Sequence, residues 1–194
     1  LTIVWKGQTC RLCRTDELKI KGGHNVENAL AAAAAAFLAG ARIPKIIEVL
    51  EEFAGVEHRI EPVATIAGVS YYNDSKATNT DSTIKALEAF AKGHVILLAG
   101  GHDKGTELTA MMALAKEKCD ALILLGEAKE RFYGAAQAAG VANIHVVNSF
   151  EEAVNTAYSI AKEPQVVLLS PACSSYDMFK NYPERGRYFK ELVN

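Results

Sequence analysis

Three short stretches of this sequence gather the side chains that could take part in chemistry. They are "NDSKATN" at 73–79, "GGHDKGTE" at 100–107 and "SPACSSYD" at 170–177. All three carry hydroxyl side chains, and two of them carry a lysine, Lys76 or Lys104. Ammonium groups, hydroxyls and the free N–H groups of a helix N-terminus all stabilise carboxylates and phosphates. The stretches therefore indicate a site for an anion or an amino acid.

Each stretch also has a simpler structural interpretation. The first could be a helix N-cap near 80–82 with solvated neighbours, because Ser, Thr, Asp and Asn are the preferred capping residues. The second could be a glycine-rich turn, and the third a strand end followed by an ordinary cap. Elsewhere, His24 and Asn28 lie one helical turn apart, and His58 precedes Arg59. Capping or exposed charge would explain both of these pairs.

The three stretches follow segments whose pattern predicts a parallel sheet. Short apolar strands are expected at 70–73, 94–100, 121–126, 144–148 and 165–170. A helical pattern follows each of them, at 80–91, 107–118, 127–139, 150–162 and 176–193. This alternation is typical of a Rossmann-like α/β fold, a mostly parallel sheet with helices on both faces. Ligands of such sheets bind beyond the carboxyl ends of the strands, where the three stretches lie.

The part of the chain before this alternation has a different organisation. Two β-like runs, "LTIVW" and "CRLCRT", precede a helix within 22–43 and a second helix within 43–55. A hairpin with its turn near Ala67–Gly68 then opens the alternating region. We expect two domains, 1–55 and 57–194, of which the first is incomplete. The chain begins at a leucine in a β-like run, so we interpret it as part of a longer protein; a processed N-terminus is the alternative.

Composition limits the classes of protein and partner. The 194 residues are 49% hydrophobic and 23% charged, enough to bury a core. The net charge is −2 and no basic patch is present, so we expect no nucleic-acid partner. The longest apolar run, 29–41, is shorter than the ~20 residues that span a bilayer, so we expect no membrane association. The single CxxC, Cys10 and Cys13, lacks a second pair of cysteines, so we predict no metal site. The cysteines have no compact disulfide spacing, which favours a reducing cytoplasm.

Five motifs together resemble the Mur ligases. In order along the chain they are "GGHNVENALAAAAAA", "EHRIE", "NDSKATNTDSTIKAL", "LLAGGHDKGTEL" and "LLSPACSSYDMFKNYPERGRYF". The "NDSKATN" motif is similar to the branch that adds D-glutamate. The Asp-Asn-Pro-Arg motif of the branch that adds L-lysine or diaminopimelate is absent. The resemblance implies that 1–55 is the C-terminal part of a P-loop ATPase domain and that 57–194 is the domain that binds the amino acid.

The resemblance also implies an activity. Such an enzyme is an ATP-dependent ligase that joins D-glutamate to UDP-N-acetylmuramoyl-L-alanine through an acyl phosphate, in the synthesis of peptidoglycan for the cell wall and cell division. The implied cofactors are ATP and Mg²⁺, and the implied protein is a monomer of the bacterial cytoplasm. No G-K-[ST] occurs in the chain, so the phosphate loop and metal ligands are expected outside it. We therefore assign no catalytic residue within the chain and expect the chain alone to be inactive.

Matching the motifs residue by residue assigns two sets of ligand-binding side chains. The set implied for D-glutamate is Lys104, Thr78, Ser175 and Tyr182, the last at a position where the family often has Phe and uses its main chain. The set implied for ATP is Asn25, Asn28, His24, His58, Arg59, Asp74 and Lys76.

Two other interpretations stay open at this point. One is another amino-acid ligase of the same superfamily, such as a folylpolyglutamate synthase, although the motifs at 73–79 and 170–179 argue against it. The other is a non-catalytic Rossmann-like binding module. A nicotinamide-dependent dehydrogenase is disfavoured, because no G-x-G-x-x-G follows a strand.

Overall fold

The protein folds as two compact units. A computed structural model describes all 194 residues and divides them into an N-terminal unit, Leu1–Gly55, and a C-terminal unit, Val56–Asn194. The division follows Gly55, whose φ of 99° is a conformation that glycine adopts far more readily than other residues. No helix of the structure combines the length and the apolar character needed to cross a bilayer.

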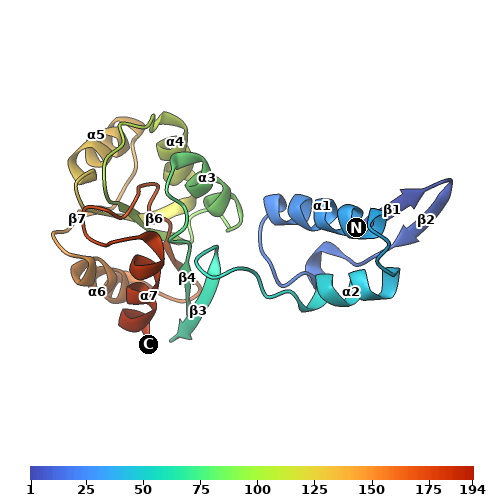
Figure 1. Ribbon diagram of the computed structural model, residues 1–194. Helices are drawn as coiled ribbons and strands as arrows, with labels where there is room; N and C mark the ends of the chain where they lie inside the picture. The colour runs from blue at the N-terminus through green and yellow to red at the C-terminus, as the bar shows by residue number, and fades with distance from the viewer. The chain divides into compact units, whose positions relative to one another are not determined.

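The N-terminal unit is a hairpin followed by helices (Figure 1). Strands β1 (Thr2–Trp5) and β2 (Gln8–Arg11) pair antiparallel, and η1 (Thr15–Glu17), α1 (Gly23–Leu38) and α2 (Ile43–Glu52) follow. Pro44 lies in the first turn of α2, where its missing N–H costs nothing. All cysteines are free. The core of this unit is formed by Leu12, Cys13, Leu18, Ala29, Ala33, Ile46 and Leu50.

The C-terminal unit is built on a six-stranded sheet with the order β3-β4-β8-β5-β6-β7. Strand β3 (Glu61–Ile66) is antiparallel to β4 (Val69–Asn73), and the turn between them is Ala67–Gly68, as predicted, with positive φ at both residues. The parallel strands are β4, β8 (Val166–Leu169), β5 (Val95–Gly100), β6 (Cys119–Leu125) and β7 (Ile144–Val146). The predicted α/β fold with a mostly parallel sheet is confirmed.

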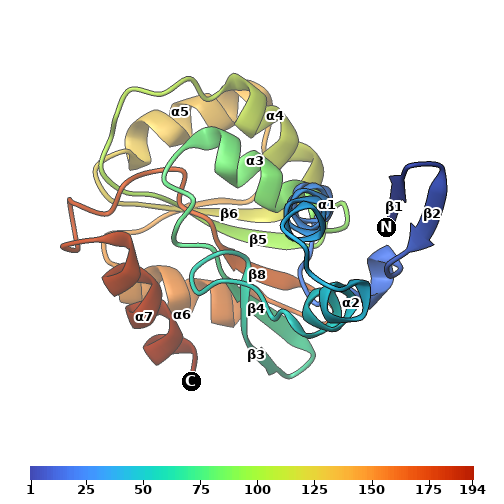
Figure 2. The same cartoon turned by 45° about the vertical axis from the view of Figure 1, so that its right-hand side comes forward.

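Helices cover both faces of this sheet (Figure 2). One face packs against α3 (Thr80–Glu88), α4 (Thr109–Lys118) and α5 (Lys129–Ala139), and the other against α6 (Phe150–Ile160) and α7 (Tyr182–Val193). Strand β5 is buried throughout and turns alternate side chains to the two cores, because successive side chains of a strand point to opposite faces. Burying each such aliphatic side chain stabilises the fold by about 1.5–3 kcal/mol.

The last helix begins six residues later than the predicted 176–193 (Tyr182 in place of 176). Its N-cap is Asn181, whose side chain accepts a hydrogen bond from the Glu184 N–H, and Pro183 lies in the first turn. The preceding segment instead turns on Ser175, whose carbonyl accepts from the N–H groups of residues 178 and 179. Both ends of the helices α3, α4, α5 and α6 lie within three residues of their predicted limits.

We expect amide hydrogen exchange to be faster in residues 1–20 than in residues 95–99 and 166–170. Strands β1 and β2 are mostly exposed and have no further strand beside them, whereas β5 and β8 are central in their sheet. Exchange measured by mass spectrometry on the folded chain checks this difference. Equal protection of the three segments would contradict it.

Candidate functional site

The strand order places the three polar stretches side by side. Strand β8 lies between β4 and β5, so the loop 170–177 emerges between the loops 73–79 and 100–107. We call these segments the β4 loop (73–79), the β5 loop (100–107) and the β8 loop (170–177). The chain leaves β4 and reaches β5 two places away, which makes this the switch point where open α/β sheets bind ligands.

The β4 loop is not a solvated turn. Asn73, Asp74 and Ser75 are at most 4% exposed, so the interpretation with solvated neighbours is wrong for these three residues. A helix N-cap is present, one residue before the expected positions 80–82. The side chain of Asn79 accepts a hydrogen bond from the Ser82 N–H at the start of α3. The polar residues of this loop are therefore held by specific partners.

Asp74 is turned inward and both of its carboxylate oxygens have donors. Oδ1 accepts from the Ile60 N–H at 3.1 Å and Oδ2 from the Ser170 hydroxyl at 2.8 Å. Burial raises the pKa of Asp74 to about 7, although both hydrogen bonds oppose the shift. In this structure the carboxylate of Asp74 joins the β4 loop to the end of β8, and its assignment to ATP stays a prediction.

The β5 loop is held by two contacts immediately before Lys104. The N–H of His102 donates to the Ser174 carbonyl at 3.0 Å, which joins this loop to the β8 loop. Asp103 accepts two hydrogen bonds from the guanidinium of Arg131, at 2.5 and 2.8 Å, and this pairing lowers the pKa of Asp103 to about 2. The backbone around Lys104 is thus anchored to α5 and to the β8 loop.

Lys104 contacts the β4 loop through the main chain of that loop. Its ammonium group donates to the carbonyl oxygen of Thr78 at 2.7 Å. Ser175 is 2% exposed and follows Ser174, the residue that pairs with the β5 loop. The structure therefore brings Lys104 and Thr78 into contact. A backbone hydrogen bond also joins the β8 loop, which carries Ser175, to the β5 loop, which carries Lys104.

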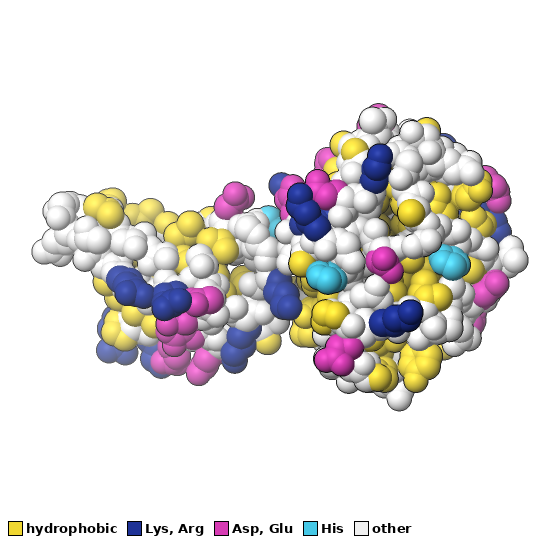
Figure 3. Space-filling model, turned by 180° about the vertical axis from the view of Figure 1, so that it is seen from behind, with side chains coloured by type: hydrophobic (Ala, Val, Ile, Leu, Met, Phe, Trp, Pro, Cys, Tyr) yellow, Lys and Arg dark blue, Asp and Glu magenta, His cyan; other side chains and the backbone are white.

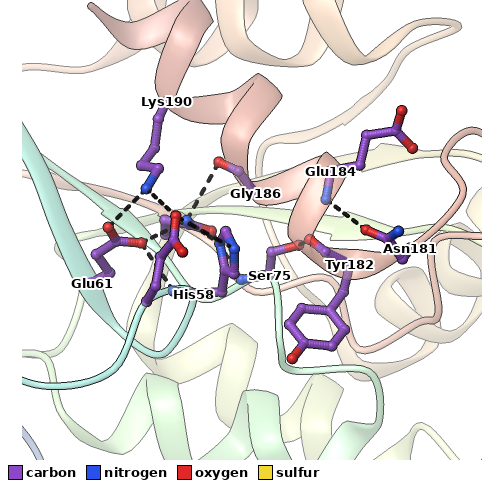
Figure 4. Close-up of polar contacts among 10 residues, drawn as sticks. His58, Glu61, Ser75, Asn181, Tyr182, Glu184, Gly186 and Lys190 are labelled. Atoms are coloured by element: carbon purple, nitrogen blue, oxygen red, sulfur yellow. Dashed lines mark hydrogen bonds and ion pairs between the residues drawn. The ribbon is translucent and has the colours of Figure 1, made fainter.

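Tyr182, which is assigned to D-glutamate, contacts Ser75 and two residues assigned to ATP (Figure 4). Its carbonyl accepts a hydrogen bond from the Ser75 hydroxyl at 2.8 Å. Its ring centroid is 5.8 Å from the ammonium of Lys76 and 5.8 Å from the ring of His58, in an edge-to-face arrangement with the latter. The side chain of Tyr182 consequently contacts the predicted nucleotide residues, while its main chain supports the β4 loop.

His58 is neutral in this arrangement because of Asn73. The Ser75 N–H donates to Asn73 Oδ1, so the amide Nδ2 of Asn73 faces His58 Nδ1, 2.9 Å away. Nδ1 must then be the acceptor, and the ring proton is on Nε2. Burial lowers the pKa of His58, in agreement with this geometry.

The two carboxylates around His58 pair with one lysine (Figure 4). Glu57, His58 and Glu61 lie close enough together to surround a cation. Lys190 of α7 already donates to Glu57 at 2.7 Å and to Glu61 at 3.0 Å. The ammonium group therefore takes the place that a metal ion would need, and we assign no metal site here.

Replacing Gly186 with alanine should destabilise the C-terminal unit by about 1–3 kcal/mol. A Cβ at this position would lie 2.3 Å from His58 Nδ1 and 3.0 Å from Asn73 Nδ2, so α7 or the His58–Asn73 pair must move. Urea unfolding of the chain measures the change.

Gly134→Ala is the matched control. Gly134 is an exposed glycine inside α5 with open space around its Cα, so alanine there should stabilise by about 0.5–1 kcal/mol. Equal stability of Gly186→Ala and the wild type would show that the close packing is not needed.

The remaining predicted residues belong to two places. Arg59 is exposed near the start of the C-terminal unit. His24, Asn25 and Asn28 lie in the first turns of α1 in the N-terminal unit, where Asn25 donates to the Lys21 carbonyl and accepts from Asn28. The assignment of these residues to ATP stays a prediction.

Several residues that shape the site were missed by sequence reasoning. They come from segments quoted as motifs or from neighbouring helices, and they are Glu61, Asn73, Ser75, Asp103, Arg131, Arg185, Gly186 and Lys190. For Arg185 and Gly186 the signal was the run "YPERGRYF", where a glycine beside charged residues inside a helical pattern indicates close packing.

The fold is that of a Rossmann-like α/β domain with three polar loops at the carboxyl edge of its sheet. The chain belongs to the Mur ligases, because the family described as "Mur ligase, glutamate ligase domain" matches residues 58–173.

Curated relatives extend the similarity over nearly the whole chain. The UDP-N-acetylmuramoylalanine--D-glutamate ligase of Caldicellulosiruptor bescii is 45% identical over 190 residues, which are 98% of this chain and 41% of that protein. The protein of the same name from Pelotomaculum thermopropionicum is 47% identical over 182 residues, 94% of this chain and 40% of that protein. The chain thus spans about two fifths of the length of these relatives.

Solved structures share the fold at low identity. The UDP-N-acetylmuramate-alanine ligase MurC of Thermotoga maritima matches with a TM-score of 0.69 and 20% identity, covering 91% of this chain and 39% of that one. A folylpolyglutamate synthase of Mycobacterium tuberculosis, complexed with ADP, matches with a TM-score of 0.68 and 13% identity, covering 89% and 41%. These likenesses concern the fold, since ligases for different substrates match about equally well.

Proposed function

We propose that the complete protein containing this chain is an ATP-dependent ligase that joins D-glutamate to UDP-N-acetylmuramoyl-L-alanine in the bacterial cytoplasm. The observation that carries the proposal is the contact of the Lys104 ammonium, on the β5 loop, with the β4 loop, at the sheet edge that also carries the β8 loop. The names of the relatives, at 45–47% identity, support D-glutamate as the amino acid.

The chemistry explains why a cationic, hydroxyl-rich site is needed. A carboxylate is a poor electrophile, so it is first phosphorylated, and the amine of D-glutamate then attacks the acyl phosphate and releases phosphate. The side-chain carboxylate of D-glutamate must be recognised without blocking its amine. Lys104 supplies attraction, and the hydroxyls of Thr78 and Ser175 with the main chain of Tyr182 supply orientation, which lowers the barrier by positioning.

The exposed cations near this edge suit a nucleotide. Lys76 and Arg59 are both exposed and carry the charge that phosphates need, while His58 is buried behind them. ATP supplies the phosphoryl group, and we propose that the adenine contacts come from Asn25 and Asn28, with His24 lining the same region. The ligands of Mg²⁺ would lie outside this chain.

On the face shown in Figure 3, acidic and basic side chains of the C-terminal unit are scattered. We propose a monomer with small-molecule partners only.

The test is a reconstituted reaction of the complete protein. With ATP, Mg²⁺, D-glutamate and UDP-N-acetylmuramoyl-L-alanine, we expect ADP, phosphate and an amide product identified by mass, and none when any substrate is omitted. Dihydrofolate with L-glutamate serves as the competing substrate pair for a folylpolyglutamate-type ligase. Product from that pair alone, or from neither pair, would contradict the proposal. The chain of 194 residues by itself is expected to give no product.

A further inference from the structure

Arg185, on α7, is a buried cation without a carboxylate partner. It is 1% exposed and is the largest of the fully buried side chains, yet it makes no ion pair in the structure. Burial lowers the pKa of Arg185 to about 10, so it remains protonated at neutral pH. Burying a charge without an ion-pair partner is costly, so we expect Arg185 to make a contribution that offsets this cost.

The guanidinium of Arg185 contacts two of the polar loops by hydrogen bonds. Nε donates to the Ser75 hydroxyl at 3.0 Å and Nη2 to the Ser75 carbonyl at 2.8 Å, both in the β4 loop. Nη2 also donates to the Cys173 carbonyl at 3.1 Å, in the β8 loop. One planar side chain therefore fixes the separation of the loops that carry Thr78 and Ser175.

The third loop packs against the same guanidinium. A Cβ added to Gly101 of the β5 loop would lie 3.3 Å from Arg185 Nη1 and 2.5 Å from the Ser174 carbonyl. Nη1 itself has no hydrogen-bond partner, and neither does the buried hydroxyl of Ser174. The guanidinium of Arg185 therefore contacts all three loops, two by hydrogen bonds and one by packing.

We propose that Arg185 is the positioning residue that sets the spacing of the three loops and so fixes Lys104, Thr78 and Ser175 around the amino acid. The inference rests on the proposed function, because it concerns the same D-glutamate site. Arg185 acts through the loops and does not touch the substrate. The five donors of a guanidinium stand in a rigid planar fork, which a lysine ammonium cannot reproduce.

The test compares Arg185→Lys with Arg187→Lys in the complete ligase. Arg185→Lys keeps the charge and loses the fork, so we expect the KM for D-glutamate to rise about ten-fold or more, and the KM for ATP to change by less than about two-fold. Arg187 is exposed on the same helix, and its substitution by lysine should leave both constants unchanged. Circular dichroism and the melting temperature establish that each variant is folded at the assay temperature.

A second variant covers the case in which Arg185→Lys does not fold. Ser75→Ala removes the hydroxyl that accepts from Arg185 Nε and should raise the KM for D-glutamate several-fold with little change in the KM for ATP. A folded Arg185→Lys with an unchanged KM for D-glutamate, or equal increases for both substrates, would overturn the inference. If Arg185→Lys is unfolded, an unchanged KM in Ser75→Ala would do so. Failure of the wild type to use D-glutamate would instead overturn the proposed function.

Discussion

Replacing Lys104 with alanine in the complete ligase should raise the KM for D-glutamate by about ten- to a hundred-fold and leave the KM for ATP nearly unchanged. The ammonium of Lys104, on the β5 loop, bonds only the Thr78 carbonyl of the β4 loop, so in the complex it is available to a carboxylate. Losing a charge-assisted contact of this kind costs about 1.5–3 kcal/mol. Steady-state kinetics with each substrate varied in turn measure the effect.

The control for this substitution is Lys92→Ala. Lys92 is an exposed lysine that pairs with Glu117 at 2.8 Å, and surface pairs of this kind contribute at most about 1 kcal/mol to stability. Its loss should leave both Michaelis constants unchanged. If Lys104→Ala behaved in the same way as Lys92→Ala, Lys104 would not be the residue that recognises the substrate carboxylate.

Replacing Asp74 with asparagine should remove a pH-dependent loss of stability between about pH 4 and pH 7. The pKa of Asp74 is raised by burial from 3.8 to about 7 in the folded chain, so the folded state holds its proton more tightly than the unfolded state does. The resulting stabilisation is fully present below pH 3.8 and is lost as the pH rises through about 7. A shift of this size corresponds to up to about 4 kcal/mol.

Urea unfolding of the wild-type chain and of Asp74→Asn at several pH values isolates this contribution. Asparagine can still accept from the Ile60 N–H, and Ser170 also lies within hydrogen-bond distance of Thr83, so the variant retains partners. The difference in unfolding free energy between the two chains should favour the variant increasingly as the pH rises. Parallel curves across this range would mean that Asp74 does not titrate there.

Local features of the C-terminal unit were determined by the sequence. Continuous apolar runs such as β5 predict strands buried on both faces, and Gly68 marks the hairpin turn because the turn needs positive φ. The polar stretches were correctly placed at strand ends, and the contact of Lys104 with the β4 loop followed from that placement with the resemblance to the family. These features depend on neighbouring residues or on a periodic pattern, which a sequence displays directly.

The tertiary structure decided which strand ends are neighbours and which polar groups are buried. Strand β8 inserts between β4 and β5, a pairing between segments about 70 to 100 residues apart that no local pattern encodes. That order packs α7 behind the β4 loop, so Arg185 becomes a buried cross-link and Asp74 turns toward Ser170. Burial of a polar group is set by what packs over it, and here those residues come from the far end of the chain.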